Sequence, residues 1–115
     1  MPPSELRVSK DRRTLTVVFD GQQPAALPAE ALRVMSPSAE VQGHSPDQRV
    51  TVPGKRHVAI AGVEPVGNYA IRIVFDDGHD TGIYSWTYLN ELTTDLDRRW
   101  AVYLSELEDK GLDRG

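Results

Sequence analysis

Residues 69–86 contain two strand-like segments on either side of an Asp-Gly dipeptide, and this pattern constrains the fold more than any other feature of the chain. In the first segment, YAIRIVF, large apolar or aromatic side chains stand at every second position, which is the period of a β-strand with one buried face. The dipeptide Asp77–Gly78 is a strong signal for a two-residue hairpin turn. The sequence therefore predicts an antiparallel hairpin in which these two residues form the turn.

This turn fixes which residues face each other across the hairpin, since a shift by one residue would move every side chain to the other face. Ile71 then lies opposite Tyr84 on the apolar face, and Asp76 lies opposite His79 at the tip of the other face. A carboxylate beside an imidazole raises the imidazole pKa and fixes its tautomer. The Asp76–His79 pair could therefore act as a base or contribute two ligands to a metal. The simpler alternative is a polar hairpin tip with no chemistry of its own.

Residues 57–66 form a further strand-like run and complete a three-stranded meander with the hairpin. Gly67–Asn68 separates this run from residues 69–75 and suits a tight primed turn. Glu64 and Pro65 interrupt the apolar pattern, which predicts a bulge or a position at the edge of the sheet.

The N-terminal part predicts another hairpin, followed by a short helix and a long loop. The run LTVVF (15–19) follows LRVSKDRRT, in which the tetrapeptide KDRR is polar enough to turn. The next residues break the β pattern, and Pro28 suits the first position of a helix over Ala29 to Val34. Residues 36–56 are mostly loop, and a loop of this length in a compact domain is often functional or disordered.

The last third of the chain predicts two helices. Ser85 caps a short first helix, and Thr94 followed by Asp97 resembles a capping box that begins the second. Lys110–Gly111 provides a stop signal for the second helix. The second helix carries one apolar stripe, formed by Leu96, Trp100, Tyr103, Leu104 and Leu107.

Together these segments predict a single α+β domain over residues 1–115. Its fold is a small antiparallel β-meander sheet, with a short helix after the second strand and C-terminal helices packed on the sheet. With 115 residues, the chain is long enough to bury one modest core without disulfides or metals.

Charge and composition argue against several classes of function. The chain carries 17 acidic and 13 basic residues, and its densest basic groups are pairs, so we expect no nucleic-acid partner. No apolar run approaches the about 20 residues of a membrane span, and the first ten residues lack the apolar segment of a signal peptide. We therefore expect a cytoplasmic protein without a membrane partner. The absence of cysteine excludes disulfides and a thiolate metal site.

No complete catalytic motif stands in the sequence. It has neither a phosphate-binding loop followed by Lys and Ser or Thr nor a G-x-S-x-G elbow. Asp76 and His79 would need a third ligand to hold a catalytic zinc or iron. His44, Asp47 or Glu40 could supply that ligand only if the long loop folds back over the hairpin tip. We therefore expect no enzymatic activity.

Three segments resemble the gamma-butyrobetaine hydroxylase-like N-terminal domain family: LRVMSPSAEVQGHSP (32–46), VEPVGNYAIRIVFDDGHDTGIYSW (63–86) and YLNEL (88–92). The resemblance runs from about residue 6 to residue 92, with a helix at about 95–110 as an appendage, and implies a small α+β domain. In carnitine-pathway dioxygenases such a domain precedes the catalytic domain. Related domains stand alone in bacteria or are fused to P-loop iron–sulfur carrier proteins. The resemblance does not extend to the iron ligands or the 2-oxoglutarate pocket of the dioxygenases.

The resemblance also carries a zinc site, with three cysteines and one histidine as ligands in the zinc-binding relatives. The cysteines fall where this chain has Ser36, Ser38 and Val41, and the histidine matches His79. Serine hydroxyls are poor zinc ligands, and a valine side chain cannot bind zinc. We therefore expect the family zinc site to be lost, and we assign no cofactor to the chain. The resemblance places residues 36–44 beside His79. The binding residues that we expect are Glu40, His44, Asp76, Asp77, His79, Asp80 and Trp86.

Three hypotheses follow for the function. The first is a non-catalytic interaction or accessory module with an unidentified protein partner, linked through its relatives to iron–sulfur or dioxygenase systems. The second is a protein that binds iron or zinc weakly through His79, His44 and nearby carboxylates. The third, ranked last, is an enzyme that uses the Asp76–His79 pair as a base. An edge strand within residues 6–19 could also pair with a second copy of the chain to form a homodimer.

Overall fold

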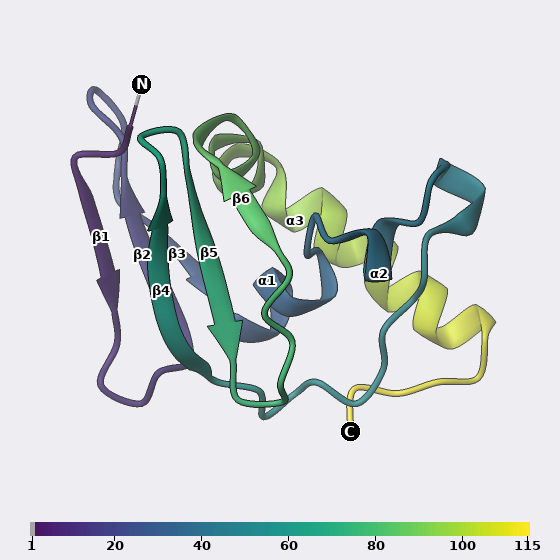
Figure 1. Cartoon of the computed structure of the whole chain (residues 1–115). Helices are drawn as coiled ribbons and strands as arrows, with labels where there is room; N and C mark the ends of the chain where they lie inside the picture. Colours follow the sequence, from purple (N-terminus) through teal and green to yellow (C-terminus); the bar gives the residue numbers. More distant parts are fainter. Residues whose placement is uncertain (1) are drawn as a thin grey trace.

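Two antiparallel three-stranded sheets and a long C-terminal helix form the frame of the computed structural model, which describes residues 2–115 (Figure 1). The first sheet has the order β1-β2-β3 and the second has the order β4-β5-β6. The strands are β1 (Glu5–Val8), β2 (Thr14–Val18), β3 (Ala25–Pro28), β4 (Ile60–Val66), β5 (Ala70–Phe75) and β6 (Ile83–Ser85). The helices are α1 (Ala29–Val34), α2 (Ala39–Gln42) and α3 (Trp86–Asp109), with a single 3-10 turn at Pro46–Gln48. The predicted α+β fold with helices packed on antiparallel strands is confirmed.

Strand β3 is an element that the sequence does not predict. It pairs with β2 through Leu15 opposite Leu27 and Thr14 opposite Pro28, so the short helix α1 follows the third strand of the chain. Pro28 ends the strand and also precedes the first turn of α1, where its missing N–H costs no intrahelical bond. The predicted helix over Ala29 to Val34 is confirmed.

The hairpin between β4 and β5 differs from the prediction in its turn and in its bulge. Val66 lies opposite Ala70, so the loop has three residues instead of two. Tyr69, the third of these, lies outside the strand with 57% of its surface exposed. The bulge lies between Ile60 and Gly62 and not at Glu64 and Pro65. Strand β4 does lie at the edge of its sheet, which is the other position that Glu64 and Pro65 predict.

Helix α3 consists of two helical segments that meet at a kink at Asp95, whose φ of −126° and ψ of 15° are not helical. The predicted division of the last third of the chain into two helices is therefore confirmed. Ser85 caps the helix, since its Oγ accepts a hydrogen bond from the Tyr88 N–H at 3.1 Å. Thr94 does not cap a second helix as predicted, because its hydroxyl donates back to the carbonyl oxygens of Asn90 and Glu91. Such back-bonding is a common companion of a bent helix. The helix ends at Asp109, with Lys110 as its C-cap, in agreement with the predicted stop signal at Lys110–Gly111.

One apolar core lies between the two sheets and the helices. Helix α3 contacts both β3 and β6, so it ties the sheets together. Leu104, predicted to lie on the buried stripe of α3, is 39% exposed. The fully buried large side chains of the core are Leu15, Val17, Leu27, Leu32, Val41, Ile60, Ile73, Phe75, Tyr84, Leu89 and Leu92.

The C-terminal tail returns to the body of the molecule beyond α3. The Gly54 and Arg56 N–H groups donate to the carbonyl oxygens of Asp113 and Arg114 at 3.0 and 2.8 Å. The Arg114 guanidinium also donates through Nε and Nη2 to both carboxylate oxygens of Glu30, which is only 7% exposed. The tail therefore clasps the loop after residue 53 and the start of α1.

Candidate functional site

The tip of the β5–β6 hairpin is a three-residue loop. The Gly78 N–H donates to the Phe75 carbonyl oxygen at 3.1 Å, and the Phe75 N–H donates to the His79 carbonyl oxygen at 3.0 Å. Asp76, Asp77 and Gly78 thus form the loop, and Gly78 takes the positive φ of 91° that a turn with a bulge requires. The prediction of a two-residue turn at Asp77–Gly78 is wrong, whereas the predicted register further along the strands is confirmed, with Ile71 opposite Tyr84.

The extra residue in the loop separates Asp76 from His79. Asp76 turns toward the chain before β4, where its Oδ1 accepts from the Ala59 N–H at 3.0 Å and its own N–H donates to the Ala59 carbonyl oxygen. His79 turns the other way and is only 5% exposed. The predicted side-by-side Asp76–His79 pair does not form, which removes the arrangement on which the base hypothesis depended.

His79 instead joins the segment that the resemblance placed beside it. Its Nε2 lies 2.8 Å from Ser36 Oγ, and its Nδ1 lies 3.2 Å from Glu40 Oε2. An ionised carboxylate can only accept, so Nδ1 carries the proton and Nε2 accepts the hydroxyl proton of Ser36. Burial, and after it the positive charge of Arg33, lowers the pKa of His79 despite the opposing effect of Glu40. The ring is therefore neutral at pH 7, in agreement with this tautomer.

The order Ser36–His79–Glu40 reproduces the connectivity of a hydrolase triad, but the serine has no access to a substrate. Ser36 is 0% exposed, and its Oγ also accepts from the Ser38 N–H at 3.2 Å. Gly82 closes over it so tightly that a Cβ atom there would lie 2.5 Å from Ser36 Oγ. A nucleophile must reach a carbonyl carbon while its base stays in contact. The three residues therefore form a buried cross-link between residues 36–40 and the hairpin.

Asp77 forms a second connection at the same tip. Its Oδ2 lies 2.8 Å from Arg33 Nε and 2.6 Å from Lys55 Nζ, and its Oδ1 accepts from the His79 N–H at 3.0 Å. Burial alone would raise the pKa of Asp77, but these donors and charges outweigh it and hold that pKa far below its usual range. Arg33 and Lys55 come from distant parts of the chain, and no local sequence pattern marks them. We call Arg33, Ser36, Glu40, Lys55, Asp77 and His79 the polar cluster.

The remaining predicted binding residues lie outside the polar cluster. His44 is exposed, and its N–H donates to Gln48 Oε1. Asp80 lies 3.9 Å from Arg72 Nη1, and the Trp86 Nε1–H donates to the Asn68 carbonyl oxygen at 2.8 Å. The structure therefore brings together Glu40, Asp77 and His79 but not His44, Asp76, Asp80 or Trp86.

The residues at the family zinc positions do not fit a zinc ion. Ser36 Oγ is held by His79 and Ser38, whereas Ser38 Oγ turns to Thr81 Oγ1 at 2.7 Å. Val41 is a core residue with 2% of its surface exposed and offers no donor atom. Within residues 2–115 no three His, Cys, Asp or Glu side chains are grouped so that they could hold a metal. Weak iron or zinc binding stays a prediction.

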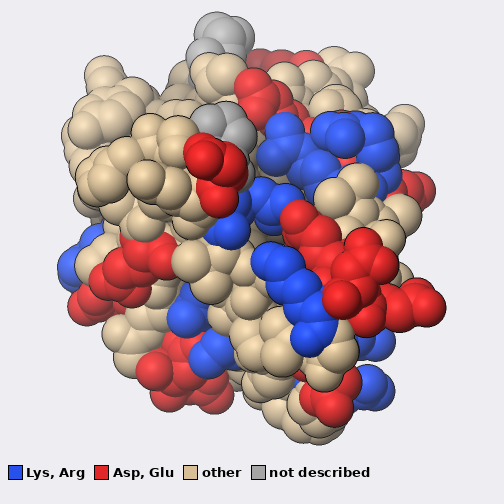
Figure 2. Space-filling model, turned by 90° about the vertical axis from the view of Figure 1, so that its right-hand side faces the viewer, with Lys and Arg blue, Asp and Glu red and all other residues tan. Residues whose placement is uncertain are grey.

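A hollow of about 810 Å³ lies between residues 34–49 and α3, and no residue of the polar cluster is among those that line it in the described chain. Its walls carry the arginines Arg49, Arg98 and Arg99. Its apolar and aromatic lining comes from Val34, Met35, Tyr88, Val102 and Tyr103. Figure 2 shows basic side chains running down one face of the molecule with acidic side chains beside them. We call this hollow the arginine groove.

No sequence pattern predicts the arginine groove. The only local signal was the Arg98–Arg99 pair, which by itself is too small to suggest a binding site. Arg49 joins it because its guanidinium forms an ion pair with Glu106 on α3, across 57 residues of chain.

The comparisons with known proteins agree with this fold. A protein described as having an NMR solution structure is 50% identical, with 98% of this chain and 89% of that chain covered and a TM-score of 0.85. A second NMR solution structure is 43% identical, with 98% and 84% covered and a TM-score of 0.83. A crystal structure from Acidithiobacillus ferrooxidans, of a protein of unknown function in the DUF971 family, is 37% identical, with 79% and 91% covered and a TM-score of 0.65.

No curated protein matches the chain. No helix within the described residues is long and apolar enough to cross a membrane. The family model described as gamma-butyrobetaine hydroxylase-like, N-terminal, matches residues 6–90, which include both sheets, the polar cluster and the first turn of α3. This chain belongs to the gamma-butyrobetaine hydroxylase-like N-terminal domain family.

Proposed function

We propose that the chain is a non-catalytic interaction module that docks a protein partner in the arginine groove. One contrast carries this proposal. In the polar cluster, the histidine and the serine that could act as base and nucleophile are buried, with His79 5% exposed and Ser36 without exposed surface. The open hollow offers arginine, aromatic and aliphatic side chains, without Ser, His, Cys, Asp or Glu among those that line it in the described chain.

The two tyrosines of the groove do not supply a base. The Tyr88 hydroxyl donates to the Met35 carbonyl oxygen at 2.5 Å, and the Tyr103 hydroxyl donates to the Val52 carbonyl oxygen at 2.6 Å. Burial raises the pKa of Tyr88 above its usual value and raises the pKa of Tyr103 to about 12. Both side chains therefore stay neutral and present ring surface to the groove.

This lining has the composition of a protein-binding surface. Tyr, Met and Arg are enriched at the centres of protein interfaces, and binding energy concentrates on Tyr, Trp and Arg. The resemblance also implies that related domains are fused to dioxygenases and to iron–sulfur carriers, which are arrangements in which a small domain serves a larger partner.

Site-specific photo-cross-linking in cells tests the proposal. A photoreactive amino acid replaces Val102, which lines the groove and is 42% exposed, or Tyr69, which is 57% exposed on the β4–β5 loop and serves as the control. We expect one discrete protein adduct at position 102 and none at position 69. The absence of an adduct at both positions would contradict an interaction module. An adduct at position 69 alone would keep the module but move its interface.

The alternative function is weak metal binding at His79 and Glu40. The contact between His79 Nδ1 and Glu40 favours it, because the Glu40 carboxylate is 64% exposed and a metal ion in solution could reach it. Amide NMR titration of metal-free protein with zinc, and with ferrous iron under anaerobic conditions, separates the two functions. Saturable shifts at residues 78–80 that disappear in Glu40→Gln would favour the metal function. Shifts that stay unsaturated would exclude it.

A further inference from the structure

We infer that the arginine groove binds an extended acidic segment of the partner protein, in which two carboxylate side chains flank an apolar one. This inference rests on the proposed function and adds the chemistry of its partner. It follows from where the arginines are anchored, which of their donors stay free and how far apart they stand along α3.

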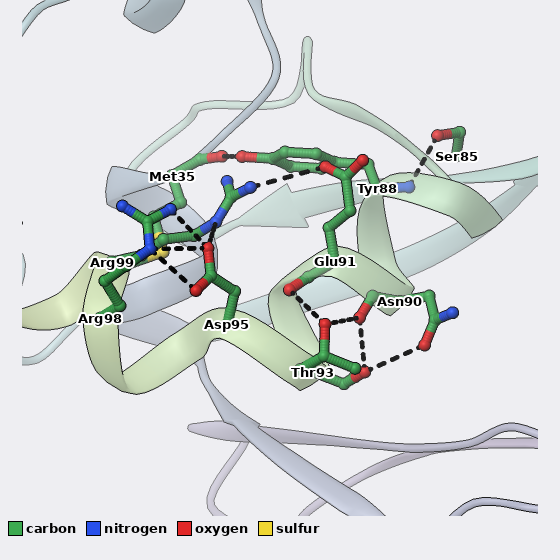
Figure 3. Close-up of polar contacts among 10 residues, drawn as sticks. Met35, Ser85, Tyr88, Asn90, Glu91, Thr93, Asp95, Arg98 and Arg99 are labelled. Atoms are coloured by element: carbon green, nitrogen blue, oxygen red, sulfur yellow. Dashed lines mark hydrogen bonds and ion pairs between the residues drawn. The ribbon is translucent and has the colours of Figure 1, made fainter.

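The bend in α3 anchors two of the arginines (Figure 3). Arg98 donates to both carboxylate oxygens of Asp95, and Arg99 donates to Asp95 Oδ2 at 3.1 Å and to Glu91 at 3.5 Å. The guanidinium of Arg99 also stands 5.6 Å from the centroid of the Tyr88 ring, at cation–π distance. Held by two carboxylates and the Tyr88 ring, the Arg99 guanidinium loses little conformational freedom when a ligand arrives, whereas Arg98 is 67% exposed and held by Asp95 alone.

Each arginine of the groove keeps free donors. The hydrogen bonds of Arg98 and Arg99 within residues 2–115 use Nε and Nη2, and the bond of Arg49 to Glu106 uses Nη2. All three Nη1 groups therefore remain for a ligand among the described contacts. A guanidinium has five N–H donors in a fixed fork that matches a carboxylate.

The charge of the groove differs from the charge of the whole chain. The chain has a net charge of −4, yet no carboxylate lines the groove in the described residues. Glu91, Asp95 and Glu106 hold the arginines from outside the lining. These three carboxylates balance the charge of the three arginines, so the free Nη1 donors and not a net positive charge select the ligand. A guanidinium can only donate, and a carboxylate is the acceptor that matches its fork.

The spacing along α3 selects an extended segment over a small anion. Arg98, Val102 and Glu106 stand four residues apart and share one helix face, and Glu106 holds Arg49. At a rise of about 1.5 Å per residue, the Arg98 and Glu106 positions are about 12 Å apart. A strand places alternate side chains on one face at about 3.3 Å per residue, so residues i and i+4 span about 13 Å. The matching pattern is acidic-x-apolar-x-acidic, with the apolar side chain over Val102.

Selection from a displayed library of random 12-residue peptides tests the inference. The library is panned on the wild-type chain and on the variants R98E and R49E. The variant R7E serves as the matched control, because it changes the net charge by the same amount at a position on β1. We expect wild type and R7E to enrich acidic-x-apolar-x-acidic sequences, and R98E and R49E to lose them. The best peptide, made synthetically, should shift the amide resonances of residues 98–103 and bind R98E at least about tenfold more weakly.

Two synthetic controls sharpen the result. Asn or Gln in place of the two acidic residues should weaken binding at least about tenfold, and a peptide with adjacent acidic residues should also bind more weakly. Enrichment without acidic bias, no enrichment at all, or equal binding of free glutarate would overturn the inference. A natural partner could cross-link at position 102 and yet bind wild type and R98E equally. This result would support the proposed function but overturn the inference that the partner binds through an acidic segment.

Discussion

At the scale of single residues, His79 cross-links residues 36–40 to the β5–β6 hairpin. His79 satisfies both ring nitrogens inside the protein, at Ser36 Oγ and Glu40 Oε2. A buried polar group that loses its partner costs about 1–3 kcal/mol. The contribution of His79 should therefore be measurable as a change in the free energy of unfolding.

Replacing His79 tests this role. His79→Ala leaves the Ser36 hydroxyl without its acceptor and opens a cavity, so the free energy of unfolding should fall by about 2–4 kcal/mol in urea titrations. His44→Ala, at an exposed histidine, should change it by less than about 0.5 kcal/mol. Equal effects of the two substitutions would contradict the cross-link.

The titration of His79 is a second test at this scale. Its folded pKa lies below 6.5, so the unfolded chain binds a proton where the folded chain does not. The free energy of unfolding therefore falls as the pH decreases from about 6.5 toward the folded pKa. Ring resonances should give a midpoint below 6.5, and Glu40→Gln, which removes a neighbouring negative charge, should lower it further. A midpoint above 6.5 would show that Glu40 outweighs burial.

The closed contact at Gly82 gives a third test. A Cβ there meets Ser36 Oγ at 2.5 Å and the Tyr84 ring at 3.1 Å, whereas a Cβ at Gly62 in β4 meets nothing within 4 Å. Gly82→Ala should therefore lower the free energy of unfolding by about 1–3 kcal/mol, the usual cost of overpacking. Gly62→Ala, measured beside it by urea unfolding, should stay near wild type.

At the scale of elements, the end of β6 and the start of α3 depend on one side chain. Ser85 Oγ accepts from the Tyr88 N–H, which would otherwise lack a partner in the first helical turn. Ser85→Ala should cost about 1 kcal/mol of unfolding free energy. Ser105→Ala, at an exposed position inside the same helix, should be neutral or slightly stabilising, because alanine has the higher helix propensity.

In the β5–β6 hairpin, the local sequence pattern predicts the strand register but not the length of the loop. The β5–β6 register was predictable because Ile71, Ile73 and Phe75 alternate into the core. The loop length was not, because an Asp-Gly pair suits both a two-residue turn and a three-residue turn with a bulge. The contact that decides between them, from Asp76 to Ala59, joins segments distant in sequence.

Strand β3 and the arginine groove escaped prediction for a similar reason. Ala25 and Ala26 have little intrinsic preference for a strand, and they form one only through pairing with β2. Arg49 and Arg98 line the same groove only because the long loop lies along α3. The resemblance placed residues 36–44 beside His79, but it gave no information on these two features.

At the scale of the whole molecule, the C-terminal tail completes the structure. Glu30 is 7% exposed and has Arg114 as its cation, and the same guanidinium stands 5.3 Å from the centroid of the Trp100 ring. Arg114→Ala should lower the free energy of unfolding by about 1.5–3 kcal/mol, as expected for hydrogen bonds to a charged group. Arg13→Ala, at an exposed turn arginine, should have almost no effect in the same thermal or urea unfolding.

The clasp by residues 113–114 also bears on the lifetime of the protein. A protease that cuts the chain after α3 must wait until the two backbone hydrogen bonds to residues 54–56 open, so we expect cleavage there to be slow. Once a cut separates Arg114 from the domain, the Glu30 carboxylate is left buried without its cation, and the unfolded fraction should rise. Opening of this one contact would thus couple a local cut to turnover of the whole domain.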